Sequence, residues 1–220
     1  DNALTGGVGY FRGKKVLLLG IDKGKNTNDR ILRNFGMARP EGYRKAIRLM
    51  ELANRFNLPV LSFIDTAGAY PGKGAEERGQ AQAIASCVDA CLKLNTPMIS
   101  TILGEGGSGG AIALTSGNVI LMFEHSIFSV ISPEGCASIL WRDASKANEA
   151  AKALKLTAKD MKKLNIIDEI IQEPLGGAHR DYAQSLTLLG DSIELQLNKL
   201  LELDTQELKI MKQNKYLKIT

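Results

Sequence analysis

The chain has 220 residues, of which 44% are hydrophobic and 24% charged, as in a soluble globular protein long enough for one packed core. Its net charge of +4 suits an anionic ligand, but no basic cluster is interleaved with aromatic residues, which argues against nucleic-acid binding. No run of about 18 apolar residues and no signal peptide is visible, so the sequence predicts no membrane span. Three cysteines without CxxC spacing indicate small buried residues rather than a disulfide scaffold or a zinc site.

Strands and helices alternate along the first part of the chain. The apolar run at residues 16–21 predicts a buried strand, and the polar residues 22–26 predict a turn. An amphipathic helix is predicted to begin at Pro40, because proline in a first helical turn loses no hydrogen bond, and to stop before Pro59. Residues 60–64 then predict a second strand.

The same alternation continues further along the chain. One long helix is predicted over residues 76–94, and from residue 144 onward helices dominate. Short apolar runs predict further strands over 98–103, 119–123, 127–131 and, in part, 166–171. The last long helix carries an apolar stripe of Leu186, Leu189, Ile193, Leu197 and Leu200. Together these elements predict an α/β fold with a largely parallel sheet.

Two glycine-rich segments carry most of the information about function. Residues 63–72 read FIDTAGAYPG and residues 102–111 read ILGEGGSGGA, and each follows an apolar run and leads into a predicted helix. Because glycine has no Cβ, it lets a ligand come close to bare backbone N–H groups. Two such segments side by side predict a site whose catalytic groups are peptide N–H donors, as in an oxyanion hole.

The second segment also fits another class of protein. Residues 104–109 match G-x-G-x-x-G formally, and Glu124 follows about twenty residues later, as in a dinucleotide-binding fold. An NAD(P)-binding oxidoreductase that uses the loop from Gly104 to Gly109 is therefore an alternative. Against it, a near-equivalent glycine segment ends the preceding strand, and a dinucleotide fold does not require one.

Other polar patterns support no further class of enzyme. Residues 20–26 are one residue short of a Walker phosphate loop, and Asn26 stands where Ser or Thr should hold magnesium. Lys23 and Lys25 are interpreted as exposed turn residues, with contact to a ligand's anionic groups as the alternative. His125 and His179 have no serine or cysteine at nucleophile spacing, so a hydrolase triad is unsupported.

Seven segments match one known family in order and in spacing. They are residues 33–37 (RNFGM), 40–45 (PEGYRK), 65–72 (DTAGAYPG), 76–80 (EERGQ), 104–111 (GEGGSGGA), 129–141 (SVISPEGCASILW) and 173–180 (EPLGGAHR). The match runs nearly end to end. On these segments the chain resembles the carboxyltransferase alpha subunit of the multisubunit acetyl-CoA carboxylase of bacteria and plastids.

The resemblance implies a crotonase (ClpP-like) superfamily fold, with repeated β-β-α units and C-terminal helices. It implies a single carboxyltransferase domain over residues 1–220, mainly helical from about residue 144. Family members have about a hundred further residues at the N-terminus, so the chain is expected to be N-terminally truncated. The resemblance also implies a location in the bacterial cytoplasm or the plastid stroma.

The implied reaction is transfer of a carboxyl group from carboxybiotin to acetyl-CoA, which gives malonyl-CoA for fatty-acid synthesis. Biotin arrives on a separate biotin carboxyl carrier protein, within a larger complex that includes biotin carboxylase. A beta subunit, expected to carry zinc, completes an α2β2 heterotetramer, whereas no metal is expected in this chain. Negative charge develops on the ureido oxygen of biotin and on the thioester oxygen, which agrees with a site of N–H donors and few titratable groups.

The resemblance also assigns roles to residues of the two glycine-rich segments and of the segment at residues 129–141. The backbone of Gly109 and Gly110 is expected to form the oxyanion hole, with Gly106 and Gly107 shaping the approach to it. Substrate and biotin contacts are expected from Ala67, Gly68, Ala69, Tyr70, Ser108, Ala111, Ser132, Pro133 and Glu134.

Two further alternatives share parts of this interpretation. An acyl-CoA hydratase or isomerase of the same fold would need a pair of carboxylates beside the hole, for which Glu105 and Glu134 are the candidates. A non-catalytic interaction protein would assemble with a partner without turnover.

Overall fold

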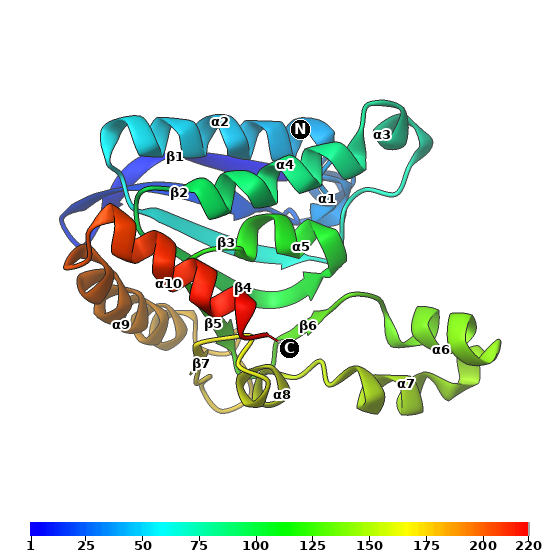
Figure 1. The fold of residues 1–220 in the computed structure, drawn as a ribbon. Helices are drawn as coiled ribbons and strands as arrows, with labels where there is room; N and C mark the ends of the chain where they lie inside the picture. The colour runs from blue at the N-terminus through cyan, green and yellow to red at the C-terminus, as the bar shows by residue number, and fades with distance from the viewer. Residues whose placement is uncertain (220) are drawn as a thin grey trace.

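The computed structural model describes residues 1–219, which form a seven-stranded sheet with helices on both faces (Figure 1). A first pair, β1 (Leu4–Phe11) and β2 (Lys14–Ile21), is an antiparallel hairpin at one edge. Parallel strands follow in chain order: β3 (Val60–Thr66), β4 (Met98–Gly107), β5 (Val119–Phe123) and β7 (Glu169–Ile171). The short β6 (Ile127–Ser129) pairs with the last residues of β4, beyond the end of β5. The carboxyl ends of β3, β4 and β6 therefore meet at one edge of the sheet.

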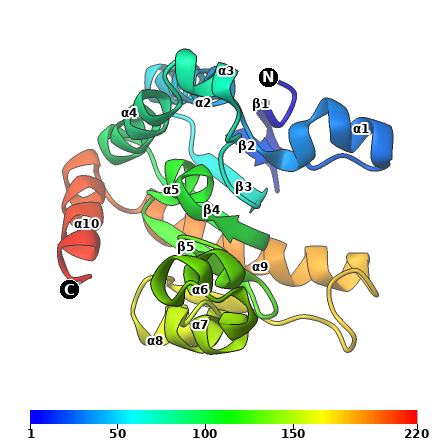
Figure 2. The same cartoon turned by 90° about the vertical axis from the view of Figure 1, so that its right-hand side faces the viewer.

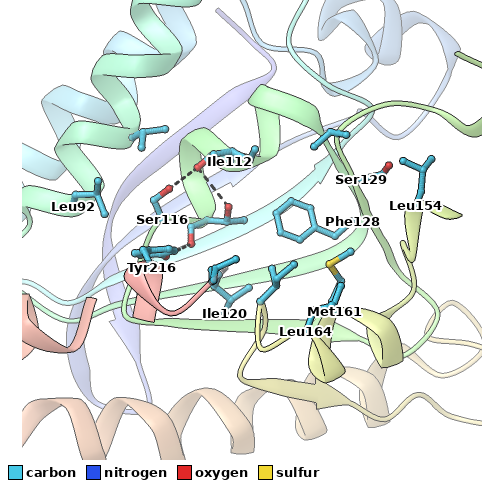
Figure 3. Close-up of a pocket in the computed structure, with 15 residues that line it drawn as sticks. Leu92, Ile112, Ser116, Ile120, Phe128, Ser129, Leu154, Met161, Leu164 and Tyr216 are labelled. Atoms are coloured by element: carbon cyan, nitrogen blue, oxygen red, sulfur yellow. Dashed lines mark hydrogen bonds between the residues drawn. The ribbon is translucent and has the colours of Figure 1, made fainter. Parts of the chain in front are cut away.

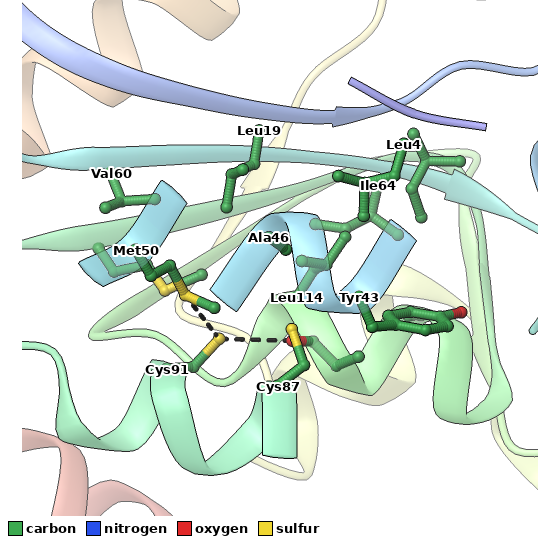
Figure 4. Packing of buried hydrophobic residues seen from close by; sticks show 14 of the residues in the cluster. Leu4, Leu19, Tyr43, Ala46, Met50, Val60, Ile64, Cys87, Cys91 and Leu114 are labelled. Carbon is green, nitrogen blue, oxygen red and sulfur yellow. Dashed lines mark hydrogen bonds between the residues drawn. The ribbon is translucent and has the colours of Figure 1, made fainter. Parts of the chain in front are cut away.

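The core has two layers, one on each face of the sheet, because the side chains of each strand point alternately to the two faces. One layer lies between the sheet and the helices α2 (Pro40–Phe56), α4 (Gln80–Lys93) and α5 (Ser108–Thr115), and contains Tyr43, Ile64 and Cys87 (Figure 4). The other layer packs residues such as Leu61 and Ile99 against α9 (Tyr182–Leu201) on the opposite face. Because successive side chains of a strand point to opposite faces, the central parallel strands contribute to both layers.

The remaining helices lie around these helix and sheet layers. Between β2 and α2 come α1 (Thr27–Leu32) and the 3₁₀ turn η1 (Asn34–Gly36), and α3 (Lys73–Glu77) precedes α4. Helix α6 (Pro133–Trp141), the turn η2 (Ala144–Lys146) and α7 (Ala147–Leu154) form an arm that extends away from the sheet (Figures 1 and 2). The arm has its own small apolar cluster of Cys136, Ala137 and Ala150. Helix α8 (Ala158–Lys163) returns the chain to β7, and α10 (Thr205–Leu217) follows α9.

The predicted α/β alternation and parallel sheet are confirmed, with corrections at several boundaries. The single helix predicted over 76–94 is wrong, because Gly79 takes φ 80° and separates α3 from α4. The strand predicted over 98–103 continues to Gly107, because β6 supplies a partner for its last residues. The strands predicted over 127–131 and 166–171 are shorter, and β1 and α1 were missed.

The burial predictions hold with one exception. Cys87, Cys91 and Cys136 are buried and free, as predicted. In the stripe of α9, four of the five predicted residues are buried, but Leu186 is 67% exposed. Within residues 1–219 no helix is both long and apolar enough to cross a lipid bilayer.

Helix α10 is fixed to the body by buried polar side chains. Lys212 is 1% exposed, and its Nζ donates to the carbonyl oxygens of Cys91 at 3.1 Å and Leu94 at 2.7 Å, at the end of α4. Lys215 pairs with Asp168, whose carboxylate also accepts the N–H of Ile120 at 2.7 Å. Burial lowers the pKa of Lys212 to about 8, because the charged ammonium loses its hydration.

This lowered pKa predicts a pH dependence of stability. Between pH 8 and pH 10 the folded protein releases the Lys212 proton while the unfolded chain still holds it, so stability rises with pH over this window. We expect the free energy of unfolding of the wild type, minus that of Lys212→Met, to increase by roughly 2 kcal/mol from pH 8 to pH 10. Urea unfolding at each pH measures this difference. A difference that stays flat with pH would contradict the prediction.

Candidate active site

The two glycine-rich segments meet backbone to backbone at the carboxyl ends of β3 and β4. Thr66 pairs with Gly106 across a β-bulge, and residues 67–69 then pass directly over the start of α5. A Cβ added to Gly107 would lie 2.2 Å from the Ala67 carbonyl oxygen, and one added to Gly110 would lie 2.6 Å from the Gly68 carbonyl carbon. Neither gap admits a side chain, so both positions require glycine.

Helix α5 begins at this contact with uncapped donors. Its N-cap is Gly107, and among the described residues no side chain caps it. The N–H groups of Ser108, Gly109 and Gly110 belong to the first turn, where an α-helix has no internal acceptor for them. Aligned peptide dipoles also place partial positive charge at this end. The first turn of α5 is therefore a set of fixed donors suited to an anionic oxygen.

The first glycine-rich segment is held rigidly from its other side. The buried Thr66 hydroxyl lies 2.8 Å from the carbonyl oxygens of Gly36 and Gly68, and accepts the Gly68 N–H at 3.1 Å. The Gln80 amide nitrogen donates to the carbonyl oxygens of Ala38 at 2.9 Å and Tyr70 at 3.0 Å. A backbone fixed in this way has a small reorganisation cost when charge develops beside it.

A cavity of about 310 Å³ opens beside the first turn of α5. Its walls come from the first glycine-rich segment, β4, β6, the start of α6 and the segment between α7 and α8. The lining residues are Ala67, Glu105, Gly106, Gly107, Ser108, Ile127, Ser129, Ile131, Ser132, Pro133, Glu134 and Leu156. The arm therefore closes one side of a cavity whose other side is the start of α5, at Gly107 and Ser108.

Seven of the predicted site residues line this cavity: Ala67, Gly106, Gly107, Ser108, Ser132, Pro133 and Glu134. Gly68, Ala69 and Gly110 lie at the backbone contact beside it, whereas Gly109 faces the Ile84 side chain. Tyr70 instead stacks on the Arg39 guanidinium, 4.7 Å from its ring centroid, and Ala111 is fully buried in the core. Sequence reasoning assigned no role to Ile127, Ser129, Ile131 and Leu156, which also line the cavity. Ser129 and Ile131 lie in the matched segment at residues 129–141, whereas Ile127 and Leu156 lie outside every matched segment and reach the cavity through the fold.

Lys23 is not the solvent-exposed turn residue that we predicted. Its Nζ lies 2.9 Å from Asp65 Oδ1 and also pairs with the Glu105 carboxylate. Burial lowers the pKa of Lys23, but the hydrogen bonds to Glu105 and Asp65 outweigh burial and leave it raised. Glu105 is thus paired with a lysine rather than with Glu134, which gives no support to the carboxylate pair of a hydratase.

The strand pairing and the strand order of the sheet argue against the dinucleotide-binding alternative. Gly104 to Gly107 belong to β4, and residues 105–107 pair with β6, so this stretch is a strand and not a phosphate loop. The parallel strands β2, β3, β4 and β5 also lie in chain order. A dinucleotide fold instead places its ligand where the strand order reverses.

A second, larger cavity of about 540 Å³ lies between α4, α5, α8 and the end of α10 (Figure 3). Its lining is mainly apolar, with residues such as Leu92, Phe128 and Leu164. The hydroxyls of two lining residues bond to the backbone of α5: Ser116 to the Ile112 carbonyl at 3.0 Å, and Tyr216 to the Thr115 carbonyl at 3.3 Å. Because these groups are already paired, this cavity is a poorer candidate for the chemistry than the cavity of about 310 Å³ beside α5, which we call the glycine-walled cavity.

Comparison with known proteins identifies close relatives. A family model described as "Acetyl co-enzyme A carboxylase carboxyltransferase-like" matches residues 1–220. The chain is 56% identical over 216 residues to the acetyl-coenzyme A carboxylase carboxyl transferase subunit alpha of Caulobacter vibrioides, covering 98% of this chain and 68% of the relative. It is 57% identical over 219 residues to the same subunit of Rhodopseudomonas palustris, covering 100% and 68%. The chain thus spans about two thirds of the length of these relatives.

Solved structures of lower sequence identity share the fold. The Pseudomonas malonate decarboxylase MdcD–MdcE hetero-dimer matches with a TM-score of 0.78 at 16% identity, over 99% of this chain and 88% of that one. The transcarboxylase 12S structure matches with a TM-score of 0.69 at 19% identity, over 84% and 36%. These neighbours share the fold of the chain and confirm the predicted α/β fold class.

The backbone contact predicts that alanine lowers the stability of the fold strongly at Gly107 but only slightly at Gly109. Gly107→Ala should lower the free energy of unfolding by about 2 kcal/mol or more, because its Cβ would overlap the Ala67 backbone, which has no flexible end to move. Gly109→Ala should change it by less than about 1 kcal/mol, since its Cβ would lie 3.5 Å from the Ile84 side chain and alanine favours a helix. Urea unfolding of both variants tests this, and equal effects would refute the contact.

Proposed function

The chain belongs to the acetyl-CoA carboxylase carboxyltransferase family, and from this premise we propose how its residues serve the family's reaction, carboxyl transfer to acetyl-CoA. The first turn of α5 acts as an oxyanion hole, with the backbone N–H groups of Gly109 and Gly110 as donors. The observation that carries this proposal is the uncapped start of α5, which is held against residues 67–69 and whose first residue, Ser108, lines the glycine-walled cavity.

The chemistry asks for donors rather than for nucleophiles. Carboxyl transfer places negative charge on an oxygen that was neutral in the ground state. One preorganised donor aimed at such an oxygen lowers the barrier by roughly 3 kcal/mol, or about a hundredfold in rate. Peptide N–H groups stay un-ionised across the working pH range and cannot be acylated or carboxylated in error. A glycine-lined wall also lets a planar ligand approach these donors closely.

The cavity fits the carboxybiotin group that the family implies. Its 310 Å³ and its combination of backbone N–H donors with the apolar Ile127 and Leu156 suit a compact bicyclic ring with a urea-like carbonyl. When bound, biotin supplies the carboxyl group to be transferred. The residues of this chain bind and orient it: Ala67 and Ser108 at the donor wall, and Ile131 and Pro133 at the wall formed by the arm.

We further propose that a beta subunit packs on the arm and completes the site, and that a biotin carboxyl carrier protein delivers the carboxyl group. Three apolar side chains on or beside α6 support the first point: Val130, Ile139 and Leu140 are 66%, 71% and 64% exposed. An exposed apolar surface beside a cavity that is open on one side is typical of a subunit interface. The relatives are named as alpha subunits, which agrees with a partner chain.

The proposal is tested by the reverse reaction, the malonyl-CoA-dependent carboxylation of free biotin. We expect activity when this chain is mixed with a carboxyltransferase beta subunit, and none with either chain alone. Co-elution of the two chains on gel filtration checks assembly independently of turnover. An assembled complex without activity would refute the proposed function of this site.

A pair of variants at one position tests the donor itself. Gly109→Pro should lower kcat at least about a hundredfold, because proline has no N–H, while a first helical turn accepts proline. Gly109→Ala keeps the N–H and should stay within about threefold of the wild type. Circular dichroism of both variants controls for folding. Equal activity in the two folded variants would show that the Gly109 N–H is not a donor.

A further inference from the structure

The turn after β2 brings a lysine to the edge of the sheet that carries the site. Lys23 pairs with Asp65, which is the next-to-last residue of β3, and with Glu105 of β4. Asp65 Oδ1 also accepts the Glu105 backbone N–H at 2.9 Å. We define these three residues as the lysine cluster. It connects the ends of three neighbouring strands at the edge where the glycine-walled cavity lies.

Two glycines make room for the lysine cluster. A Cβ added to Gly36 would lie 2.7 Å from Lys23 Cγ, and one added to Gly104 would lie 2.9 Å from Asp65 Oδ1. Gly36 also takes φ 81°, in a turn where Asn34 and Phe35 have positive φ as well. The lysine stem and the aspartate carboxylate are therefore packed into defined positions, rather than resting on an open surface.

Glu105 is one of the residues that line the cavity, one residue before Gly106, so its carboxylate belongs to the surroundings of the site. A negative charge beside an anionic oxygen works against the donors of α5, because like charges repel each other. In the structure this carboxylate is bound to the Lys23 ammonium. The hydrogen bonds within the cluster also keep the pKa of Lys23 raised, so it stays charged at neutral pH.

We propose that Lys23 is a positioning residue for carboxyl transfer: it holds the Glu105 carboxylate and compensates its charge, so that no free carboxylate opposes the N–H donors of α5. This inference rests on the proposed function of the same cavity. Strand pairing alone cannot explain the lysine, since β3 and β4 pair through their backbones and Asp65 holds the Glu105 N–H without it.

Charge variants of the assembled enzyme separate this role from simple bracing of the strands. The lysine cluster carries one net negative charge in the wild type, two in Lys23→Met and one again in Lys23→Met/Glu105→Gln. We expect Lys23→Met to lower kcat about tenfold or more, with a smaller change in the KM for malonyl-CoA. The double variant should recover most of this loss, although it lacks both members of the ion pair.

A matched control lies at the other end of the strands, away from the carboxyl ends of β3 and β4. Arg12 also bridges two carboxylates, those of Asp191 and Glu194, but it follows β1, far along the sheet from the carboxyl ends of β3 and β4. Arg12→Met should therefore keep the activity of the wild type. Thermal unfolding of every variant shows whether each one is folded at the assay temperature.

The outcomes separate this inference from the proposed function. An inactive wild-type complex would count against the proposed function. Full activity of Lys23→Met in an active system would overturn the inference alone. The inference is also overturned if the folded double variant is as inactive as Lys23→Met, because the lysine would then act only as a brace. If Lys23→Met does not fold, the folded double variant decides: high activity supports the charge role, and low activity overturns it.

Discussion

The approach of two backbones at Gly107 and Gly110 is the constraint on which the rest of the site depends. Side chains are absent there, so residues 67–69 lie directly against the first turn of α5. That contact fixes where the helix starts, which N–H groups stay uncapped and which way they point. A methyl group at either position would push the strands apart and move the donors by more than a hydrogen bond tolerates.

The fold serves this contact from several directions. Parallel strands place the ends of β3 and β4 at the same edge, and β6 extends β4 by the residues that carry the glycines. The Thr66 hydroxyl and the Gln80 amide hold the first glycine-rich segment from behind. The arm then returns over the same edge and closes the cavity. Each of these features keeps the peptide donors rigid, and rigidity is what makes a peptide N–H an effective catalyst.

Two lysines that are paired within the fold have different roles in this protein. At the end of α4, Lys212 saturates carbonyl oxygens and fixes α10, which is a contribution to packing. At the cavity edge, Lys23 is bound to two carboxylates, and the role that we propose for it concerns the charge beside the ligand. Lysine suits both because its long apolar stem can be buried while its ammonium reaches a fixed acceptor. The sequence alone does not distinguish these two lysines from those exposed on the surface.

Local properties of the sequence were sufficient for the family and for most of the sheet. Apolar runs predicted all six strands that pair in parallel, two of them too long, and the paired glycine segments led to the prediction of N–H donors, because both signals depend on a few adjacent residues. Tertiary structure alone decided the partners. The extension of β4 needs β6, the pairing of Lys23 needs Asp65 and Glu105, and Leu156 reaches the cavity only through the arm. These contacts join residues tens of positions apart, and their geometry is set by how the whole chain packs.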